Sequence, residues 1–532
     1  MGVFFWQFYP VPTDDNGPGD EVQAGNNASV SRYAELDPRA DIVLERDPER
    51  PDRINVVYSP TTHGEVVFGL AGQSGQWSDR VAEDEVGEDH VFAWPSADLK
   101  PDDVIRVTFR RGDWLATQEL RVAEARQATA EAPQGLYARR TMADRKSWIG
   151  QYGGSEASET AVADALEWLA RHQADDGSWS DRCVGTGHPE AKCEKEAPCS
   201  GPGGPYEMAL SGLAVLAFQA GGHYDFNGNR YSENVRRAID WMLGRQRPDG
   251  ALLGSKQDRA RRHFYQQFMY EHAIATFALA DACAVSQALG RPKDPRYAEA
   301  LEKAVRFIEQ MQHDDGGWRY TDRREQPSDT SVTGWPVLAL KSAREAGESL
   351  DATRVEKTRA FFEARATGER GRTGYLNHTL HTEATTGVGM LARQFLLDQP
   401  ESPYVRDASA YLAEYAEQTW PDRRADSRRA DYYLWYNCTL AMFQAGGEAW
   451  KRWNDVVRDT IVGLQRHEGC PRGSWDPDGR WGHEGGRIYS TALAALTLEV
   501  YYRYANLTEA AKRSGASGEP ETAFPLIRRK KP

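Results

Sequence analysis

One short phrase occurs twice in the chain, as "QADDGSWS" at 173–180 and "QHDDGGWRY" at 312–320. Each phrase follows an amphipathic segment. Before the second phrase, Leu301, Val305 and Ile308 recur at the spacing of one helix face. Asp-Gly then ends the helix, because glycine readily adopts the left-handed conformation of a C-terminal cap. The segment that follows, such as "YEMALSGLAVLAF", is apolar on all sides and rich in small residues, which indicates a buried helix.

This couplet of an amphipathic and an apolar segment recurs six times between residues 159 and 505. One such helix pair cannot bury its own apolar face, so the pairs must stack on one another. An open array needs polar repeats at its ends, whereas the sixth apolar segment is as apolar as the others. We therefore predict a mostly α chain in which six hairpins close into an α/α toroid, with the apolar helices inside. The repeated phrase is then the joint of a pair, where the Trp indole packs and the Gln amide binds a neighbouring backbone.

Short runs of alternating residues precede the repeats. In one of them Ile105 and Val107 alternate with Arg106 and Thr108, which is the period of a half-buried strand. Six such runs predict a small β-sandwich of immunoglobulin-like type. It carries no cluster of catalytic residue types, so we expect a spacer or a module that docks a protein partner. The predicted organisation is a flexible segment at 1–35, the β-sandwich at 36–125, a linker at 126–158, the toroid at 159–508 and a tail at 509–532.

The charge and hydropathy of the sequence limit the classes of partner that the chain can bind. The net charge of -14 argues against nucleic acid, because phosphate binding needs a basic face. No apolar run reaches the roughly 18 residues of a membrane-spanning helix, so we do not expect an integral membrane protein. The first residues, "MGVFFWQFYPVPTDD", lack the basic and apolar regions of a signal peptide, which favours the cytoplasm without fixing the compartment.

The joints "QADDGSW", "QHDDGGWRY" and "GSWDPDGRWG" resemble the QW-type repeats of squalene and oxidosqualene cyclases and of protein prenyltransferase β-subunits. "PSDTSVTGWPVLALKSA" and "GGRIYSTALAALTLEVYYRY" more closely resemble bacterial prenyltransferase/squalene-oxidase repeat proteins of mostly unassigned function. The resemblance covers about 159–505. It implies an α/α toroid whose central cavity binds, and could transform, an isoprenoid or lipid-like chain.

The catalytic motifs of those families are incomplete here. When Thr330 is aligned with the threonine of the cyclase motif DxDD-T-A, Ser328 takes the place of the acid and Asp329 is its neighbour. No cysteine stands where the prenyltransferases hold zinc. Whether the chain is an enzyme therefore stays open at this stage.

Placing the six inner segments in register puts one residue of each in a single column: Glu207, Glu271, Asp329, Glu383, Asn437 and Ser490. In a closed toroid, equivalent positions face the axis at one height, so the four carboxylates are the candidate catalytic groups. Crowding would raise the pKa of at least one of them, and such an acid can protonate an alkene or a glycoside. Alternatively, these residues cap helix N-termini, or hold a divalent cation.

The candidate substrate-binding residues are His272, Trp335, Tyr436, Asn437, Phe443 and Tyr489. As the resemblance implies, aromatic faces among them could stabilise a carbocation. His272 and Cys438 share the next column, which leaves a catalytic zinc as a further alternative.

A separate loop offers Cys183, His188, Cys193 and Cys199, a set that could hold a structural zinc. A disulfide and free thiols are the other two alternatives for this loop.

Three functional hypotheses remain. The first is an isoprenoid-binding toroid. The second is a carbohydrate-active enzyme with two carboxyl groups about 5–9.5 Å apart. The third is a binding scaffold without activity. A deep apolar tunnel would favour lipid, an open polar groove would favour sugar, and a packed centre would favour a scaffold.

Overall fold

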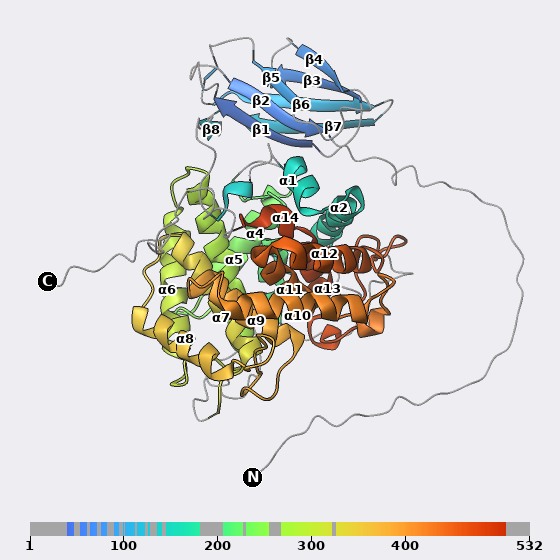
Figure 1. The fold of residues 1–532 in the computed structure, drawn as a ribbon. Helices are drawn as coiled ribbons and strands as arrows, with labels where there is room; N and C mark the ends of the chain where they lie inside the picture. The colour runs from blue at the N-terminus through green and yellow to red at the C-terminus, as the bar shows by residue number, and fades with distance from the viewer. Residues whose placement is uncertain are drawn as a thin grey trace, which may run out of the picture.

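The computed structural model describes residues 40–46, 54–60, 64–71, 76–81, 90–94, 99–100, 102–111, 114–122, 126–127, 136–140, 145–180, 206–226, 230–254, 268–321 and 326–506. Two small sheets come first and a ring of helices follows (Figure 1). The predicted fold class, a mostly α chain with an α/α toroid after a small β-sandwich, is confirmed.

The N-terminal sheets are built from β1 (Ala40–Arg46), β2 (Ile54–Pro60), β3 (Gly64–Leu70), β4 (Gln76–Val81), β5 (His90–Ala93), β6 (Val104–Arg111), β7 (Trp114–Arg121) and β8 (Arg126–Gln127). Their orders are β5-β2-β1-β8 and β4-β3-β6-β7. Ile105 and Val107 are buried and Arg106 is exposed, as the alternation predicts. The ring of Phe92 stacks on that of Phe68 at 4.1 Å, so aromatic side chains from both sheets form the core between them.

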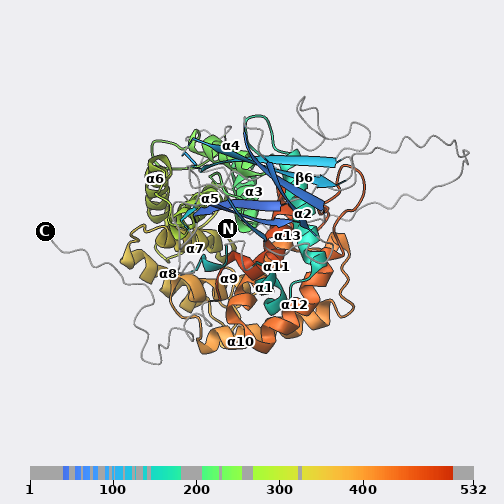
Figure 2. The same cartoon turned by 90° about the horizontal axis from the view of Figure 1, so that it is seen from above.

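In the described part of the chain, the helices form six pairs. The outer helices are α2 (Glu156–Arg171), α4 (Ser232–Leu243), α6 (Pro295–Met311), α8 (Ala352–Arg365), α10 (Pro403–Thr419) and α12 (Gly447–Val462). The inner helices are α3 (Glu207–Ala220), α5 (Phe268–Ala288), α7 (Thr330–Glu345), α9 (Glu383–Leu391) with a π-helical extension η7 (Ala392–Leu396), α11 (Tyr432–Ala445) and α13 (Gly482–Leu498). Figure 2 shows outer helices at the periphery. The ring closes because α13 packs against α3 and α12 against α2.

The remaining short helices are η3 (Ala138–Arg140), α1 (Arg145–Tyr152), η8 (Ser427–Arg429) and α14 (Val500–Arg503). The predicted linker therefore contains β8, η3 and α1. Tyr137 and Arg140 of this segment are buried, and the N–H of Ala505 donates to the carbonyl of Leu136. Residues 136–140 of the linker are thus part of the helical core.

The joint glutamines connect successive pairs. Each Nε2 donates to the carbonyl of its own joint glycine and to a carbonyl of the next outer helix. Gln173 binds Gly177 and Asn234, Gln246 binds Gly250 and Ala300, Gln312 binds Gly316 and Arg354, and Gln465 binds Gly473 and Ala161. The last bridge runs from the sixth pair back to the first. The predicted mechanical role of the glutamine is confirmed.

The joint tryptophans Trp179, Trp318 and Trp475 are almost fully buried. Their Nε1–H groups donate to carbonyls of their own outer helices, at Leu169, Ile308 and Ile461. Each indole therefore adds a donor to a carbonyl in the last turn of its helix, where the regular partner four residues further on is missing.

The joint glycines allow the closest approach between pairs. At Gly316, where φ is +88°, a β-carbon would lie 1.9 Å from the carbonyl oxygen of Lys357 in α8. The fifth joint has Arg423 instead, in a left-handed conformation with φ of +56°. Its Nε donates to the carbonyl of Asp455 in the next outer helix.

We expect Gly316→Ala to lower the Tm of the toroid strongly, because α8 must move away from the joint to admit the methyl group. Gly290→Ala is the matched control. Gly290 has φ of +68°, but no described atom lies within 4 Å of its would-be β-carbon. This control carries only the left-handed cost of about 1–2 kcal/mol. Calorimetry should therefore place the Tm of G316A well below that of G290A, and equal values would contradict the close approach.

Candidate functional site at the N-terminal ends of the inner helices

One recurring hydrogen bond fixes the register of the inner helices. A joint N–H donates to an inner-helix side chain: Trp179 to Ser211, Leu252 to His272, Trp318 to Thr333, Thr373 to Thr386 and Trp475 to Thr491. Counted from these positions, Glu207 and Asp329 lie four residues earlier, Glu383 three and Glu271 one. The four candidate carboxylates therefore do not share one register, because the joints differ in length and the column alignment ignored this.

His272 is occupied by the protein at both ring nitrogens. Its Nδ1 accepts the N–H of Leu252 at 3.0 Å, so Nε2 carries the proton and donates to the carbonyl of Ala304 at 3.1 Å. Burial lowers the pKa of His272 to about 4. The ring is therefore neutral with a fixed tautomer. This corrects the prediction that His272 contacts substrate or zinc, since neither nitrogen is available.

Glu207 and Glu271 come together beside Gly254. The fully buried Glu271 accepts the N–H of Gly254 through Oε2 at 2.9 Å. A β-carbon at Gly254 would lie 3.3 Å from Glu207 Oε2 and 3.4 Å from Glu271 Oε1. Two of the four candidate catalytic carboxylates thus lie on the same side of Gly254, and their catalytic role stays a prediction.

Glu383 lies against an outer helix. The hydroxyl of Tyr411, on α10, donates to Glu383 Oε1 at 2.6 Å. Burial raises the pKa of Tyr411, and the Glu383 carboxylate raises it further. The contact holds Glu383 against α10.

Asp329 is the N-cap of α7. Its Oδ1 accepts from the N–H of Ser331 at 2.8 Å, from the hydroxyl of Ser331 at 2.5 Å and from the N–H of Val332 at 3.1 Å. The capping interpretation therefore holds for this residue. Its other oxygen, Oδ2, is buried and lacks a close hydrogen-bond partner among the described residues, although the side chain of Tyr375 approaches the carboxylate. Capping thus uses only one of its two oxygens.

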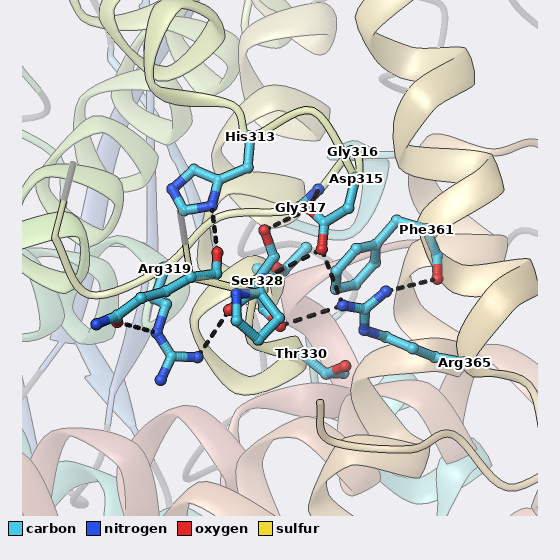
Figure 3. A network of polar contacts seen from close by, with 12 residues as sticks. His313, Asp315, Gly316, Gly317, Arg319, Ser328, Thr330, Phe361 and Arg365 are labelled. Carbon is cyan, nitrogen blue, oxygen red and sulfur yellow. Dashed lines mark hydrogen bonds and ion pairs between the residues drawn. The ribbon is translucent and has the colours of Figure 1, made fainter. Parts of the chain in front are cut away.

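A network in the third and fourth pairs fixes the residue before Asp329 (Figure 3). Ser328 donates its N–H and hydroxyl to the carboxylate of Asp315, at 3.1 and 2.6 Å. Arg365 donates to Asp315 and to the carbonyl of Ser328, both at 3.1 Å. Its guanidinium lies 3.5 Å from the ring centroid of Phe361. The joint phrase "HDDGGW" thus supplies the carboxylate that positions the turn carrying Asp329.

One tyrosine from each helix pair lies at this end of the toroid, and we call the set the tyrosine rim: Tyr206, Tyr270, Tyr320, Tyr375, Tyr433 and Tyr489. The rings of Tyr270 and Tyr320 lie 5.8 Å apart, and the hydroxyls of Tyr320 and Tyr375 hydrogen-bond at 2.7 Å. All but Tyr433 are partly exposed. Sequence reasoning found only Tyr489, although a tyrosine in every pair was a readable signal.

The rim surrounds the turn of Asp329. Tyr270 hydrogen-bonds the hydroxyl of Ser331 at 3.2 Å, and Tyr433 donates to the carbonyl of Ser331 at 2.9 Å. Burial raises the pKa of Tyr270 and Tyr433, and the nearby Asp329 carboxylate contributes to the rise. Burial also raises the pKa of Tyr320 and Tyr375. Tyr270 and Asp329 add to the rise for Tyr320, and the charge of Asp329 and a hydrogen bond with its side chain add to it for Tyr375. Four rim tyrosines are thus within electrostatic reach of Asp329.

Asp431 is a second acidic cap that sequence reasoning missed. It accepts the N–H of Leu434 at 2.9 Å at the start of α11 and lies 3.5 Å from Arg480 Nη1. Burial raises the pKa of Asp431. Tyr433 and Tyr489 both lie near this charge. Tyr433 of the rim therefore lies near two acidic groups, Asp329 and Asp431.

Below the rim, aromatic side chains meet across the axis. Trp335 of α7 stacks on Tyr436 of α11, with ring centroids 5.6 Å apart and planes 13° apart. Both are buried. Asn437 donates to the carbonyl of Tyr433, which supports the rim from below. Phe443 packs instead against Tyr152 and Trp450, away from these groups.

A buried charged cluster closes the other end of the inner helices. Arg140 binds Asp281 through both guanidinium nitrogens, at 2.5 and 3.0 Å. Lys341 Nζ lies 3.6 Å from the ring centroid of Tyr504, and Arg503 donates to the hydroxyl of Tyr436 at 3.2 Å. Burial lowers the pKa of Lys341. The segments that meet here are far apart in the chain, so no local pattern of residues predicted the cluster.

Glu499, between α13 and α14, adjoins this cluster. Both its oxygens are buried without a hydrogen-bond partner among the described residues. Burial raises its pKa to about 8, helped by Glu159 and opposed by Arg145, Arg503 and Arg140. Glu499 is therefore protonated in the folded protein at neutral pH.

Metal binding finds no support where the structure describes the chain: no group of three or more His, Cys, Asp or Glu side chains there could hold an ion. The loop with Cys183, His188, Cys193 and Cys199 lies outside the described residues, so a structural zinc remains a prediction. Cys438 is a buried free thiol whose Sγ donates to the carbonyl of Glu383. None of the described helices is long and apolar enough to span a membrane.

No family model and no curated protein matches the chain. Among solved structures, the α-1,6-mannanase of Salegentibacter sp. HEL1_6 is 11% identical, covering 65% of this chain and 99% of its own, with a TM-score of 0.45. The type II terpene cyclase MstE from Scytonema is 14% identical, covering 64% and 97%, with a TM-score of 0.39. A family 76 glycoside hydrolase from a bovine Bacteroides thetaiotaomicron strain is 10% identical, covering 88% and 99%, with a TM-score of 0.44. Likenesses this low carry no conclusion about function.

The raised pKa of Glu499 predicts a pH dependence of stability. The unfolded chain loses this proton near pH 4.5 and the folded protein only near pH 8. The stability tied to this proton is therefore full below pH 4.5 and is lost as the pH rises to about 8. Glu499→Gln cannot ionise, so its Tm should fall less than that of the wild type between about pH 5 and about pH 9. Glu401→Gln, at an exposed position, is the control. Parallel Tm curves for wild type and E499Q would contradict the burial argument.

Proposed function

We propose that the toroid binds a carbohydrate at the tyrosine rim, with Asp329 as the acidic group that contacts it. The observation that carries the proposal is the second oxygen of Asp329, which is buried without a close hydrogen-bond partner near the partly exposed phenols of Tyr270 and Tyr375. A phenol offers a flat ring face and a hydroxyl, and a carboxylate accepts hydrogen bonds from sugar hydroxyls. Together they match a ligand that has both ring faces and many hydroxyl groups.

The surroundings of two rim tyrosines support this site. Tyr270 and Tyr489 keep part of their surface accessible, yet burial raises the pKa of each. Such a combination is expected of side chains that line a concave surface rather than a flat one. Small-molecule sites are concave and pair aromatic walls with a few fixed polar groups.

The groups below the rim argue against a long hydrocarbon chain. A chain entering along the axis would first meet the stacked pair Trp335 and Tyr436 and then Arg503. Contact between hydrocarbon and a buried guanidinium is unfavourable, because the charge loses polar partners. A polar ligand that stays at the rim avoids this cost.

The second candidate is an isoprenoid. Trp335, Tyr433 and Tyr436 form an aromatic group next to the turn of Asp329, with Trp335 5.6 Å from Tyr436 and 6.3 Å from Tyr433. Aromatic faces of this kind attract a cation. An acid beside an aromatic group also suits the protonation of an alkene, so the first hypothesis drawn from the sequence keeps one specific observation.

Affinity electrophoresis in gels containing α-mannan, laminarin or hydroxyethylcellulose tests the proposal. We expect at least one of these polysaccharides to retard the wild type. Asp329→Asn keeps a capping oxygen but loses the charge, so it should weaken binding by about tenfold or more, since a hydrogen bond to a charged group contributes about 1.5–3 kcal/mol. Asp351→Asn is the matched control, because Asp351 caps the outer helix α8 in the same way.

Two results would contradict the carbohydrate proposal. Equal retardation of D329N and wild type would remove Asp329 from the site. Absence of retardation in all three gels, together with a bound lipid mass in native mass spectrometry after exposure to a lipid extract, would favour the isoprenoid instead.

A further inference from the structure

Trp481 is unusual in both its exposure and its backbone. Its side chain is 44% exposed, and among the described residues only Trp77 and Leu380 are other exposed large hydrophobic side chains. It precedes α13 in a left-handed conformation, with φ of +66° and ψ of -1°. Bulky residues rarely adopt this region, because the β-carbon approaches the backbone.

Folding stability does not account for a tryptophan here. The indole is only partly buried, so it contributes little to the free energy of folding. The left-handed conformation destabilises the fold at a tryptophan, whereas glycine adopts it without strain. Most other described residues with positive φ are glycines, as at Gly177, Gly250 and Gly473, and the other exceptions are the polar residues Arg370, Asp398 and Arg423. A strained residue that stays exposed points to a role outside the folded core.

The neighbours of Trp481 hold it in place and leave one side open. The N–H groups of Glu484 and Gly485 donate to its carbonyl at 3.0 and 3.2 Å. The Arg480 guanidinium carbon lies 5.2 Å from its ring centroid. Arg480 is itself fixed, since its N–H donates to the carbonyl of Ala430 at 2.8 Å. The indole is therefore presented on a held backbone rather than on a loose loop.

Polar contacts connect this position to the tyrosine rim on two sides. Arg480 Nη1 lies 3.5 Å from Asp431 Oδ2, close to Tyr433. On the other side, Tyr206 of the rim donates to Glu484 Oε2 at 2.8 Å. Trp481 thus stands at the edge of the rim, where the fifth and sixth pairs approach the first.

We propose that Trp481 is a stacking platform for a sugar ring, and that the ligand is an oligosaccharide extending from the tyrosine rim over this edge. The proposal rests on the proposed function. An indole face carries partial negative charge that suits the C–H groups of a pyranose. Arg480, Asp431 and Glu484 around it supply partners for the hydroxyl groups. A protein or lipid partner would instead favour a broader apolar surface than one indole framed by charges.

The test uses the full chain and whichever of α-mannan, laminarin or hydroxyethylcellulose retards the wild type. Trp481→Gly removes the indole and relieves the left-handed strain. It should weaken binding of the polysaccharide by about tenfold or more while its Tm equals or exceeds that of the wild type. Trp481→Phe keeps an aromatic face and should retain most of the affinity. The disaccharide of the same polysaccharide, if it occupies the rim alone, should bind W481G and wild type equally.

Two controls separate strain from binding. Arg423→Gly relieves a left-handed residue at the fifth joint, so its Tm should rise without a change in affinity. Leu380→Ala removes another exposed hydrophobic side chain and should leave affinity unchanged.

The outcomes are distinct. If W481G and wild type bind the polysaccharide equally, the platform is overturned and the proposed function stands. If W481G loses several degrees of Tm, the indole serves stability and the platform is overturned. If none of the three polysaccharides retards the wild type, both proposals fail together.

Discussion

The toroid depends on a side-chain amide that joins two backbone segments at once. An uncharged NH₂ group carries two donors, so one glutamine can satisfy a carbonyl of its own joint and a carbonyl of the next outer helix. Gln465 makes this bridge to Ala161, which turns a row of repeats into a ring. Without closure, the first and last apolar helices would each expose a face to water. Closure also brings the N-terminal ends of all six inner helices together at one end of the ring. The candidate site consists of the side chains at this end.

Helix termini explain why this end of the ring carries acidic residues. Free N–H groups and the positive end of each helix dipole favour carboxylates in the first turn, so Asp329 and Asp431 have a structural reason to be there. Capping needs only one oxygen, however, and the three donors around Asp329 all bind Oδ1. The tyrosines near this carboxylate are required by no cap. Capping therefore explains neither the second oxygen of Asp329 nor the tyrosines, and these groups distinguish the rim from ordinary helix N-termini.

The sequence predicted the ring and its joints because both arise from local periodicity and from one repeated phrase. It predicted the site less well, for geometric reasons. The column alignment placed Glu271 level with Asp329, which is wrong. In the second pair the joint N–H is bound by the His272 ring, whereas in the third pair it is bound by the hydroxyl of Thr333, four residues after Asp329. Tyr320 and Tyr375 come from joint loops, whose reach toward the axis no periodicity encodes. The pair Arg140 and Asp281 joins residues 141 positions apart, a contact that only the closed ring creates.

The side chains along the axis of the toroid differ from those expected of a purely structural core. Burying a carboxylate with a guanidinium costs desolvation that a pair of aliphatic side chains avoids, so charges are a poor filler where only rigidity is needed. Here polarity changes in steps, from the phenols and carboxylates of the rim through Trp335 and Tyr436 to Arg503 and Asp281. Hydrogen bonds at each level fix the aromatic side chains in single orientations, from Arg503 to Tyr436 below and from Tyr433 to Ser331 above. A ligand at the rim would meet walls that are already ordered, and would lose little free energy in arranging them.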